Sequence, residues 1–284
     1  HVLMADHAGH GLPLGLRAIE SAPLLTADPS AFINPFLGLA EKGYTFGMGQ
    51  RYGDGILRMA AFSGTGMTTN NDGFQSLDSD MVAHGVVVDY ALRPTAFTSL
   101  SVQTGLLMED GQILGLASEG VFGTPASVPS LFSSVTVASR LSDTWTLLAQ
   151  AHGGVSRPDA PSLGLVKDTS PVIASAFSAG LTGGSVLNPD DRLSVILSQP
   201  LRVEMGELGL SLPTGRTVDG RLLQGNVDIS LTPSGREMTL GIGYRGVINE
   251  SLSAEIRTGV TRHPGHDAGA ATELFGIGSF DLDF

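Results

Sequence analysis

The chain has 284 residues, which is enough for one large all-β domain. Its formal net charge of −12 argues against a nucleic-acid-binding protein. No apolar run reaches the about 18 residues of a transmembrane helix. The 38 glycines, the low charged fraction of 15% and the absence of cysteine remain compatible with a membrane β-barrel that crosses an oxidising periplasm.

Residues 1–42 show no regular alternation and contain several prolines, so they predict an irregular linker or plug segment. A short helix is expected within residues 14–25, ending before Pro23. The Asp6-His7-x-x-His10 cluster suggests either a metal site or a solvated terminus. The second alternative is favoured because no fixed third ligand is nearby, and the sequence predicts no metal and no cofactor.

From Tyr44 onwards, apolar and small or polar residues alternate with a period of two, which is typical of β-strands with one apolar face. Many of these runs have the ten to twelve residues that a tilted strand needs to cross a bilayer. Short turns alternate with longer loops, as in a barrel whose two ends face different compartments. The thirteen candidate strands are 44–51, 56–63, 81–92, 97–108, 132–141, 144–153, 172–181, 192–199, 202–212, 226–232, 237–245, 251–262 and 273–284. A barrel of this type has an even number of strands, and 202–212 is the weakest candidate, so about 12 are expected.

The sequence therefore predicts an all-β fold, an antiparallel transmembrane β-barrel of about 12 strands over residues 43–284, with residues 1–42 as linker or plug. The chain opens HVLMADHAGH, without the basic and apolar regions of a secretory signal peptide. An exported barrel needs such a signal, so we expect residue 1 not to be the start of the gene product.

The last strand has the most regular pattern, with apolar or glycine residues at every second position from Leu274 to the terminal Phe284. This strand resembles the C-terminal signature of bacterial outer-membrane barrels, which the insertion machinery reads. The resemblance implies an insertion signal at Gly276, Phe280, Leu282 and Phe284.

Aromatic residues near strand ends are candidates for the girdle at the membrane interfaces, the alternative being ordinary core aromatics. These candidates are Tyr44, Tyr90, Trp145 and Tyr244. Charged residues on the opposite faces are expected to line the lumen, either as a selectivity element or, as we favour, as a solvated or salt-paired wall. They are Arg245, Glu255, Arg257, Asp281 and Asp283. His84 lies on an otherwise apolar face, which suggests an interfacial position or a register error of one residue.

From Asn34 to Phe284 the sequence resembles the C-terminal region of subtilisin-like serine peptidases of Gram-negative bacteria, in which a catalytic domain precedes an autotransporter-like membrane domain. The resemblance rests on the segments 34–50, 57–64, 193–213, 228–245 and 262–266, of which LSVILSQPLRVEMGELGLSLP is the most specific. It implies an outer-membrane translocator or anchor for an N-terminal passenger peptidase. The implied partners are outer-membrane lipid and lipopolysaccharide, the barrel insertion machinery and the passenger, with no nucleic acid.

The resemblance does not make this chain a peptidase. Subtilisin-type catalysis needs an Asp, a His and a Ser in that order, each in its own motif. GTGMTTN (64–70) is superficially close to the serine motif, but Gly66 stands at the nucleophile position. DHAGHG (6–11) echoes a histidine motif without a suitable serine after it. The sequence therefore predicts no catalytic residue.

Two alternatives remain open. The first is a porin-like or structural outer-membrane subunit of a larger complex. The second is a soluble secreted β-sandwich that acts as a binding module, although its strands would be shorter, about five or six residues. A solenoid should show a fixed short repeat, and the sequence contains none.

Overall fold

The structure is a computed structural model, and it is antiparallel and almost entirely β. It describes residues 2–8, 32–40, 42–65, 82–117, 127–159, 164–249 and 252–282.

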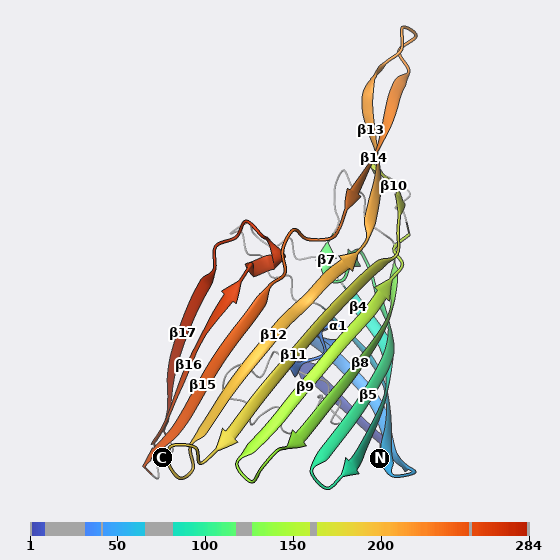
Figure 1. Ribbon diagram of the computed structural model, residues 1–284. Coiled ribbons are helices and arrows are strands. Elements are labelled where there is room, and N and C mark those ends of the chain that lie inside the picture. Colours follow the sequence, from blue (N-terminus) through green and yellow to red (C-terminus); the bar gives the residue numbers. More distant parts are fainter. Residues whose placement is uncertain are drawn as a thin grey trace.

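Twelve strands form one antiparallel sheet, which Figure 1 shows as a curved wall with α1 on its concave side. In spatial order the strands are β1 (Val2–Ala8), β2 (Lys42–Tyr52), β3 (Gly55–Thr65), β4 (Val82–Thr95), β5 (Thr98–Glu109), β8 (Val128–Arg140), β9 (Trp145–Ser156), β11 (Val172–Gly184), β12 (Arg192–Met205), β15 (Met238–Asn249), β16 (Leu252–Arg262) and β17 (Glu273–Leu282).

The strands β1 and β17 are the two edges of this sheet, and within the described residues no pairing joins them. The sequence predicts a closed barrel, whereas the described pairs form a curved sheet with two edges. Alternation fixes which side of each strand is apolar, but closure also depends on strand tilt and stagger, which alternation does not encode. Counting the smaller sheets, the described residues contain seventeen strands, more than the about 12 predicted.

Short turns join the strands at one end of the sheet, and the longer connections lie at the other end (Figure 1). The long end carries two smaller sheets and a 3-10 turn. These elements are β6 (Gln112–Ile113), β7 (Leu116–Ala117), β10 (Val166–Thr169), β13 (Glu207–Arg216), β14 (Leu222–Ser230) and η4 (Pro264–His266).

The prediction that segments 202–212 and 226–232 cross in the barrel is wrong. Residues up to Met205 extend β12, while Glu207–Arg216 and Leu222–Ser230 form a hairpin that pairs with β10 and projects beyond the large sheet (Figure 1). Alternation identifies a strand but not the sheet to which it belongs, and the break at Gly206 was the available signal.

A β-bulge interrupts β12 at Pro200. Phe177 pairs with Gln199 and Ser175 pairs with Arg202, so β12 has one more residue than β11 in this interval. Proline has no backbone N–H to donate to the ladder, which explains why the extra residue falls here.

The N-terminal region differs from the prediction in one respect. Residues Val2–Ala8 are not irregular but form β1, which pairs with β2 from Val2↔Met48 to Ala8↔Lys42. An edge strand is held by main-chain hydrogen bonds, which any non-proline residue supplies, so it needs no alternation. The short helix expected within residues 14–25 lies outside the described residues. The described helix is instead α1 (Pro35–Gly38), and none in the described ranges is long and apolar enough to cross a membrane.

An apolar cluster lies between α1 and the concave face. Phe36 and Leu37 pack with side chains of β3, β4, β5 and β8, namely Ala60, Phe62, Val87, Leu107 and Phe132. The remaining concave positions are rich in buried polar residues, among them Asp89, Gln103, Ser134, Gln150 and His152. The core is therefore built on the concave side of the sheet and includes many polar side chains.

Candidate functional site

The convex face of the sheet carries exposed apolar side chains at alternate positions. On β2 the exposed fractions are 63% for Tyr44, 57% for Phe46 and 52% for Met48, whereas Thr45 between them is buried. Further strands repeat this pattern with Met59, Val86, Val102, Leu106, Leu131, Val135, Leu197, Leu240, Ile242 and Ile256. Water-soluble proteins rarely leave so continuous an apolar surface uncovered.

All four predicted girdle residues occupy the alternate strand positions of the convex face, and Tyr44, Tyr90 and Tyr244 each adjoin a buried residue in the sequence. Tyr44 is near the long-loop end of β2, and the other three are near the short-turn end. There Tyr90 donates a hydrogen bond to the Tyr52 carbonyl, and Trp145 packs against Gly183.

His84 is exposed on the convex face of β4, opposite Ser63 and Met108. The predicted register of this strand therefore agrees with the structure. His84 lies near the long-loop end, so its imidazole can reach a polar interface.

Residues 32–40, here named the inner segment, are fastened to the concave face by Asn34. The Asn34 Nδ2 atom donates to Gln103 Oε1 at 3.1 Å and to Ser134 Oγ at 2.8 Å, while Asn34 Oδ1 accepts from the Phe36 N–H at 3.1 Å. One buried side chain thus caps α1 and ties it to β5 and β8.

Phe36 provides the apolar part of this attachment. Its ring is fully buried and stacks on Phe132, with 5.2 Å between centroids and 4° between planes. Gly154 makes room for the ring, because a Cβ atom at this position would lie 2.5 Å from Phe36 Cζ. Local alternation does not indicate this contact, since it joins residues far apart in the chain.

The concave face also holds a buried ion pair between neighbouring strands. Asp89 on β4 is fully buried, and its carboxylate accepts from Arg58 Nη2 at 2.6 Å and from the Ser101 hydroxyl. Arg58 and Asp89 are backbone partners, so both side chains point to the same side. Sequence analysis did not select these residues, although both occupy positions opposite the apolar face.

Three of the five predicted lumen charges lie together on the concave side. Arg245 and Glu255 are backbone partners on β15 and β16, Arg257 forms an ion pair with Glu255, and Arg245 Nη2 donates to Ser253 Oγ at 3.2 Å. Asp281 is a backbone partner of Ser253, and Asp283 lies outside the described residues.

A second charged cluster lies beside the bulge at the long-loop end of β12. Glu204 accepts from Arg202 Nη1 at 2.5 Å, from Arg236 Nη2 at 2.8 Å and from Ser175 Oγ at 2.7 Å. Arg236 also donates to the Gln199 amide oxygen. These bonds tie β11, β12 and the segment before β15 together beyond the point where regular pairing ends.

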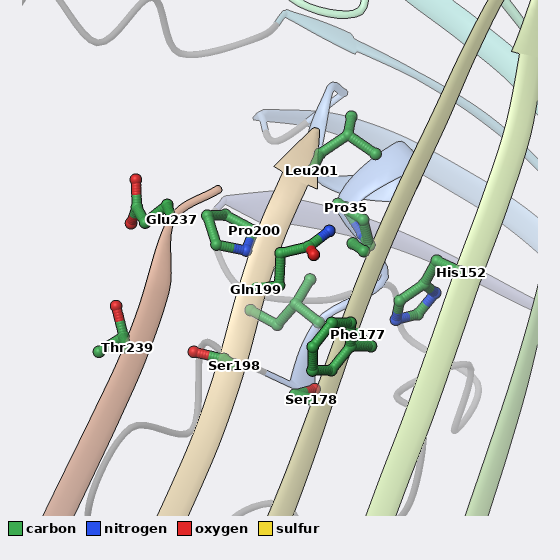
Figure 2. Close-up of a pocket in the computed structure, with 12 residues that line it drawn as sticks. Pro35, His152, Phe177, Ser178, Ser198, Gln199, Pro200, Leu201, Glu237 and Thr239 are labelled. Atoms are coloured by element: carbon green, nitrogen blue, oxygen red, sulfur yellow. The ribbon is translucent and has the colours of Figure 1, made fainter. Parts of the chain in front are cut away.

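A cavity of about 290 Å³ lies between the inner segment and the wall formed by β9, β11, β12 and β15. Figure 2 shows side chains from these elements around it, with His152 and Gln199 on different strands. His152 is only 6% exposed and its Nδ1 atom lies 2.7 Å from Ser134 Oγ, while its Nε2 atom has no hydrogen-bond partner. This histidine is the one buried imidazole in the described ranges with an unsatisfied ring nitrogen.

The turn between β11 and β12 is organised by Asp191. Its carboxylate accepts from the backbone N–H groups of Val186, Leu187 and Asn188 at 2.6, 2.8 and 2.8 Å, and from the Tyr244 hydroxyl at 3.1 Å. Partial removal from water raises the pKa of this carboxyl, but these hydrogen bonds outweigh that effect, so the pKa lies below its usual value.

The predicted insertion signal lies on β17, an edge strand whose described side chains are exposed on both faces. Phe280 is 75% exposed, a Cβ atom placed on Gly276 would meet no neighbour within 4 Å, and Leu282 is the last residue of the strand. Phe284 lies outside the described residues. Within the described ranges no group of three or more His, Cys, Asp or Glu side chains could hold a metal ion.

Comparison with known proteins gives little further information. The chain is distantly similar to the toluene transporter TodX of Pseudomonas putida, with a TM-score of 0.38 and 12% sequence identity over 85% of this chain and 74% of that chain. A similarity of this size carries no argument about function. No family model matches the chain, and no curated protein matches it.

Proposed function

We propose that this chain is a β-barrel domain of a bacterial outer membrane that serves as translocator and anchor for an N-terminal subtilisin-like passenger peptidase, and that it is not itself catalytic. The observation that carries the membrane part is the inverted polarity of the sheet. Its exposed convex face is apolar at alternate positions, whereas its concave face buries polar and charged groups. A hydrocarbon environment stabilises this distribution, and water does not.

Closure of the barrel is part of the proposal and involves β1 and β17. Each neighbouring pair in the twelve-stranded sheet is antiparallel, so the first and twelfth strands run in opposite directions. An even number of strands therefore permits an antiparallel closing pair. In hydrocarbon, unpaired main-chain groups on two open edges would be costly, which favours closure after insertion.

The alternative of a soluble β-sandwich is less well supported. A sandwich needs two stacked sheets with their apolar faces turned towards each other. Here one long sheet turns its apolar side chains outwards, and most of its strands have ten or more residues. The translocator role, in contrast to the barrel, rests on the resemblance of segments such as 193–213 to the membrane domains of secreted peptidases.

The membrane part is tested by expressing the chain behind a secretory signal and comparing its gel mobility with and without boiling. We expect an outer-membrane protein whose mobility shifts on heating. The Phe280→Asp variant should fail to accumulate in that membrane, because it places a charge in the insertion signal, while Phe97→Asp in an exposed turn should behave as the wild type. A protein that stays soluble without detergent would refute the barrel.

The translocator part requires a second experiment. A subtilisin-like domain is fused ahead of His1, and intact cells are treated with external protease. We expect the passenger to be cleaved at the cell surface. An inserted, heat-modifiable barrel whose passenger remains protected inside the cell would refute the translocator role and leave the structural-subunit alternative.

A further inference from the structure

The small sheet of β10, β13 and β14 has two edges that differ in their protection against further pairing. The edge strand β10 has only four residues, contains Lys167 and Asp168, and is interrupted by a β-bulge. Short length, charge and bulges are features that keep an edge from pairing with another strand. The opposite edge strand β14 has nine residues, LLQGNVDIS, with no proline, no bulged residue and one charge. This edge is therefore open to a further strand.

One face of β14 is apolar and half exposed. Val227 and Ile229 lie opposite Leu210 and Leu208 of β13. The exposed fractions of Val227 and Ile229 are 47% and 44%, whereas Leu210, one strand further in, is only 3% exposed. A further strand would remove this apolar surface from water. We propose that β14 pairs in antiparallel orientation with β14 of a second copy of this chain.

The backbone groups of β14 are placed for such pairing. The Leu231 N–H donates to the Gly206 carbonyl at 2.9 Å, so this residue pair is hydrogen-bonded, and bonded and non-bonded pairs alternate from there along the hairpin. Pro213, which has no N–H, falls at a non-bonded pair, in agreement with this alternation. The even-numbered residues of β14 therefore turn their N–H and C=O groups outwards, away from β13.

The sequence of β14 is complementary to itself when the two strands are centred on Asn226. This residue is the midpoint of the strand, so the register pairs all nine residues and brings the two Asn226 side chains together. On the apolar face it sets a large residue against a large one and a second large residue against glycine. The pairs between the two copies are Leu222 with Ser230, Leu223 with Ile229, Gln224 with Asp228, Gly225 with Val227 and Asn226 with Asn226.

The one charged residue of β14 meets a hydrogen-bond donor in this register. Asp228 lies opposite Gln224 of the other copy, and the Gln224 Oε1 atom already accepts from the Ser211 hydroxyl at 3.1 Å. The amide NH₂ group of Gln224 can then donate to the Asp228 carboxylate. Like charges directly opposite each other would destabilise the pairing, and this register has none between the two β14 strands.

The direction of the hairpin determines how the two copies are arranged. The hairpin follows β12 and projects beyond the large sheet (Figure 1). Antiparallel pairing therefore places the two large sheets at opposite ends of the joined hairpins. Two copies paired in this way belong to two facing membranes and not to one. This arrangement rests on the membrane part of the proposed function, whereas the pairing itself does not.

The test of the register uses engineered cysteines, because the chain has none of its own. Leu222→Cys and Ser230→Cys are purified separately in detergent, mixed and treated with a short bismaleimide. We expect a cross-linked dimer from the mixture and none from Ser230→Cys alone, whose two positions lie about 26 Å apart in this register at about 3.3 Å per residue. Lys167→Cys on β10 is the control and should stay monomeric. A mixture that does not cross-link, or Ser230→Cys that cross-links alone, would overturn the proposal.

A second pair of variants tests the contact without cysteines. Asn226→Lys places two ammonium groups opposite each other and should weaken self-association at least tenfold in sedimentation experiments. Val218→Lys adds the same charge to the fully exposed tip of the same hairpin and should leave self-association unchanged. Heat-dependent gel mobility verifies that both variants are folded. A wild-type protein that stays monomeric would leave this edge to a strand of another protein and would refute pairing between copies.

The facing-membrane arrangement has its own test. Phosphatidylcholine vesicles that carry Leu222→Cys are mixed with vesicles that carry Ser230→Cys and treated with the same bismaleimide. We expect cross-linked dimers between the two vesicle populations and clustering of the vesicles. Cross-linking only when both variants share one vesicle would contradict this arrangement. Cross-linking in detergent from a protein that does not insert into vesicles would refute the membrane part of the proposed function and leave the pairing intact.

Discussion

Removal of the Phe36 side chain should release the inner segment from the sheet. The ring is fully buried, stacks on Phe132 and fills the space above Gly154. Truncation of a buried phenylalanine to alanine costs about 3–5 kcal/mol, which includes the lost aromatic pair. If the substitution destabilises only the state in which the inner segment is attached to the sheet, the fraction of molecules with a detached segment rises about a hundred- to a few-thousand-fold.

The chain has no cysteine, so an engineered thiol reports on this release without background. Ala40 is fully buried at the end of the inner segment, and Ala40→Cys should react with a maleimide only when the segment leaves its seat. Adding Phe36→Ala should raise the labelling rate by about two to three orders of magnitude, in line with the population change.

The matched control is Phe97→Ala in the same Ala40→Cys background. Phe97 is 56% exposed and its ring contacts the Arg140 guanidinium, 4.8 Å from the ring centroid, so its removal should leave labelling unchanged. Heat-dependent gel mobility verifies that both variants retain the folded sheet. Equal labelling rates for the two phenylalanine variants would refute the view that Phe36 holds the inner segment.

Three other substitutions test separate contacts. Asp89→Ala leaves the Arg58 guanidinium without its carboxylate and should lower the free energy of unfolding by about 3–5 kcal/mol in a urea titration, and a loss below about 1 kcal/mol would contradict the importance of this pair. Gly154→Ala places a methyl group 2.5 Å from the Phe36 ring. In the Ala40→Cys background it should accelerate thiol labelling as Phe36→Ala does, and an unchanged labelling rate would contradict the role of Gly154 in making room for the ring. Asp191→Asn should destabilise the protein at neutral pH but not in acid. The folded-state pKa of Asp191 is lowered, so its contribution is present above the unfolded pKa of about 3.9 and disappears as the pH falls through the folded pKa. The difference in free energy of unfolding between the wild type and Asp191→Asn should shrink as the pH falls below about 4 and vanish only below the folded-state pKa of Asp191. A difference that stays constant over this range would show that the carboxylate charge is not involved.

Alternation predicted the strands and faces of the sheet well, because a period of two follows directly from strand geometry. The face assigned to β4, with His84 on the apolar side, agrees with the structure. What alternation could not indicate is which strands pair: the 207–230 hairpin alternates as regularly as the strands of the large sheet but belongs to another sheet. The edge strand β1 does not alternate at all and was missed for that reason.

The contacts of the inner segment were beyond sequence reasoning for a different reason. Asn34 bonds Gln103 and Ser134, residues 69 and 100 positions away, and such pairs follow from strand register and not from local pattern. Once the register is known, the signal is simple: polar residues opposite the apolar face must find partners on neighbouring strands. Arg58 with Asp89 and Arg245 with Ser253 both obey this rule.

The same contacts bear on the choice between an anchor and an open pore. A water-filled channel would solvate its wall, and paired charges would contribute little. Here Asp89 is fully buried, and Asn34 and Phe36 attach the inner segment to the wall. Burial makes these interactions strong and their loss costly. The attachment of the inner segment to the concave face supports the proposed anchoring role over a permanently open pore.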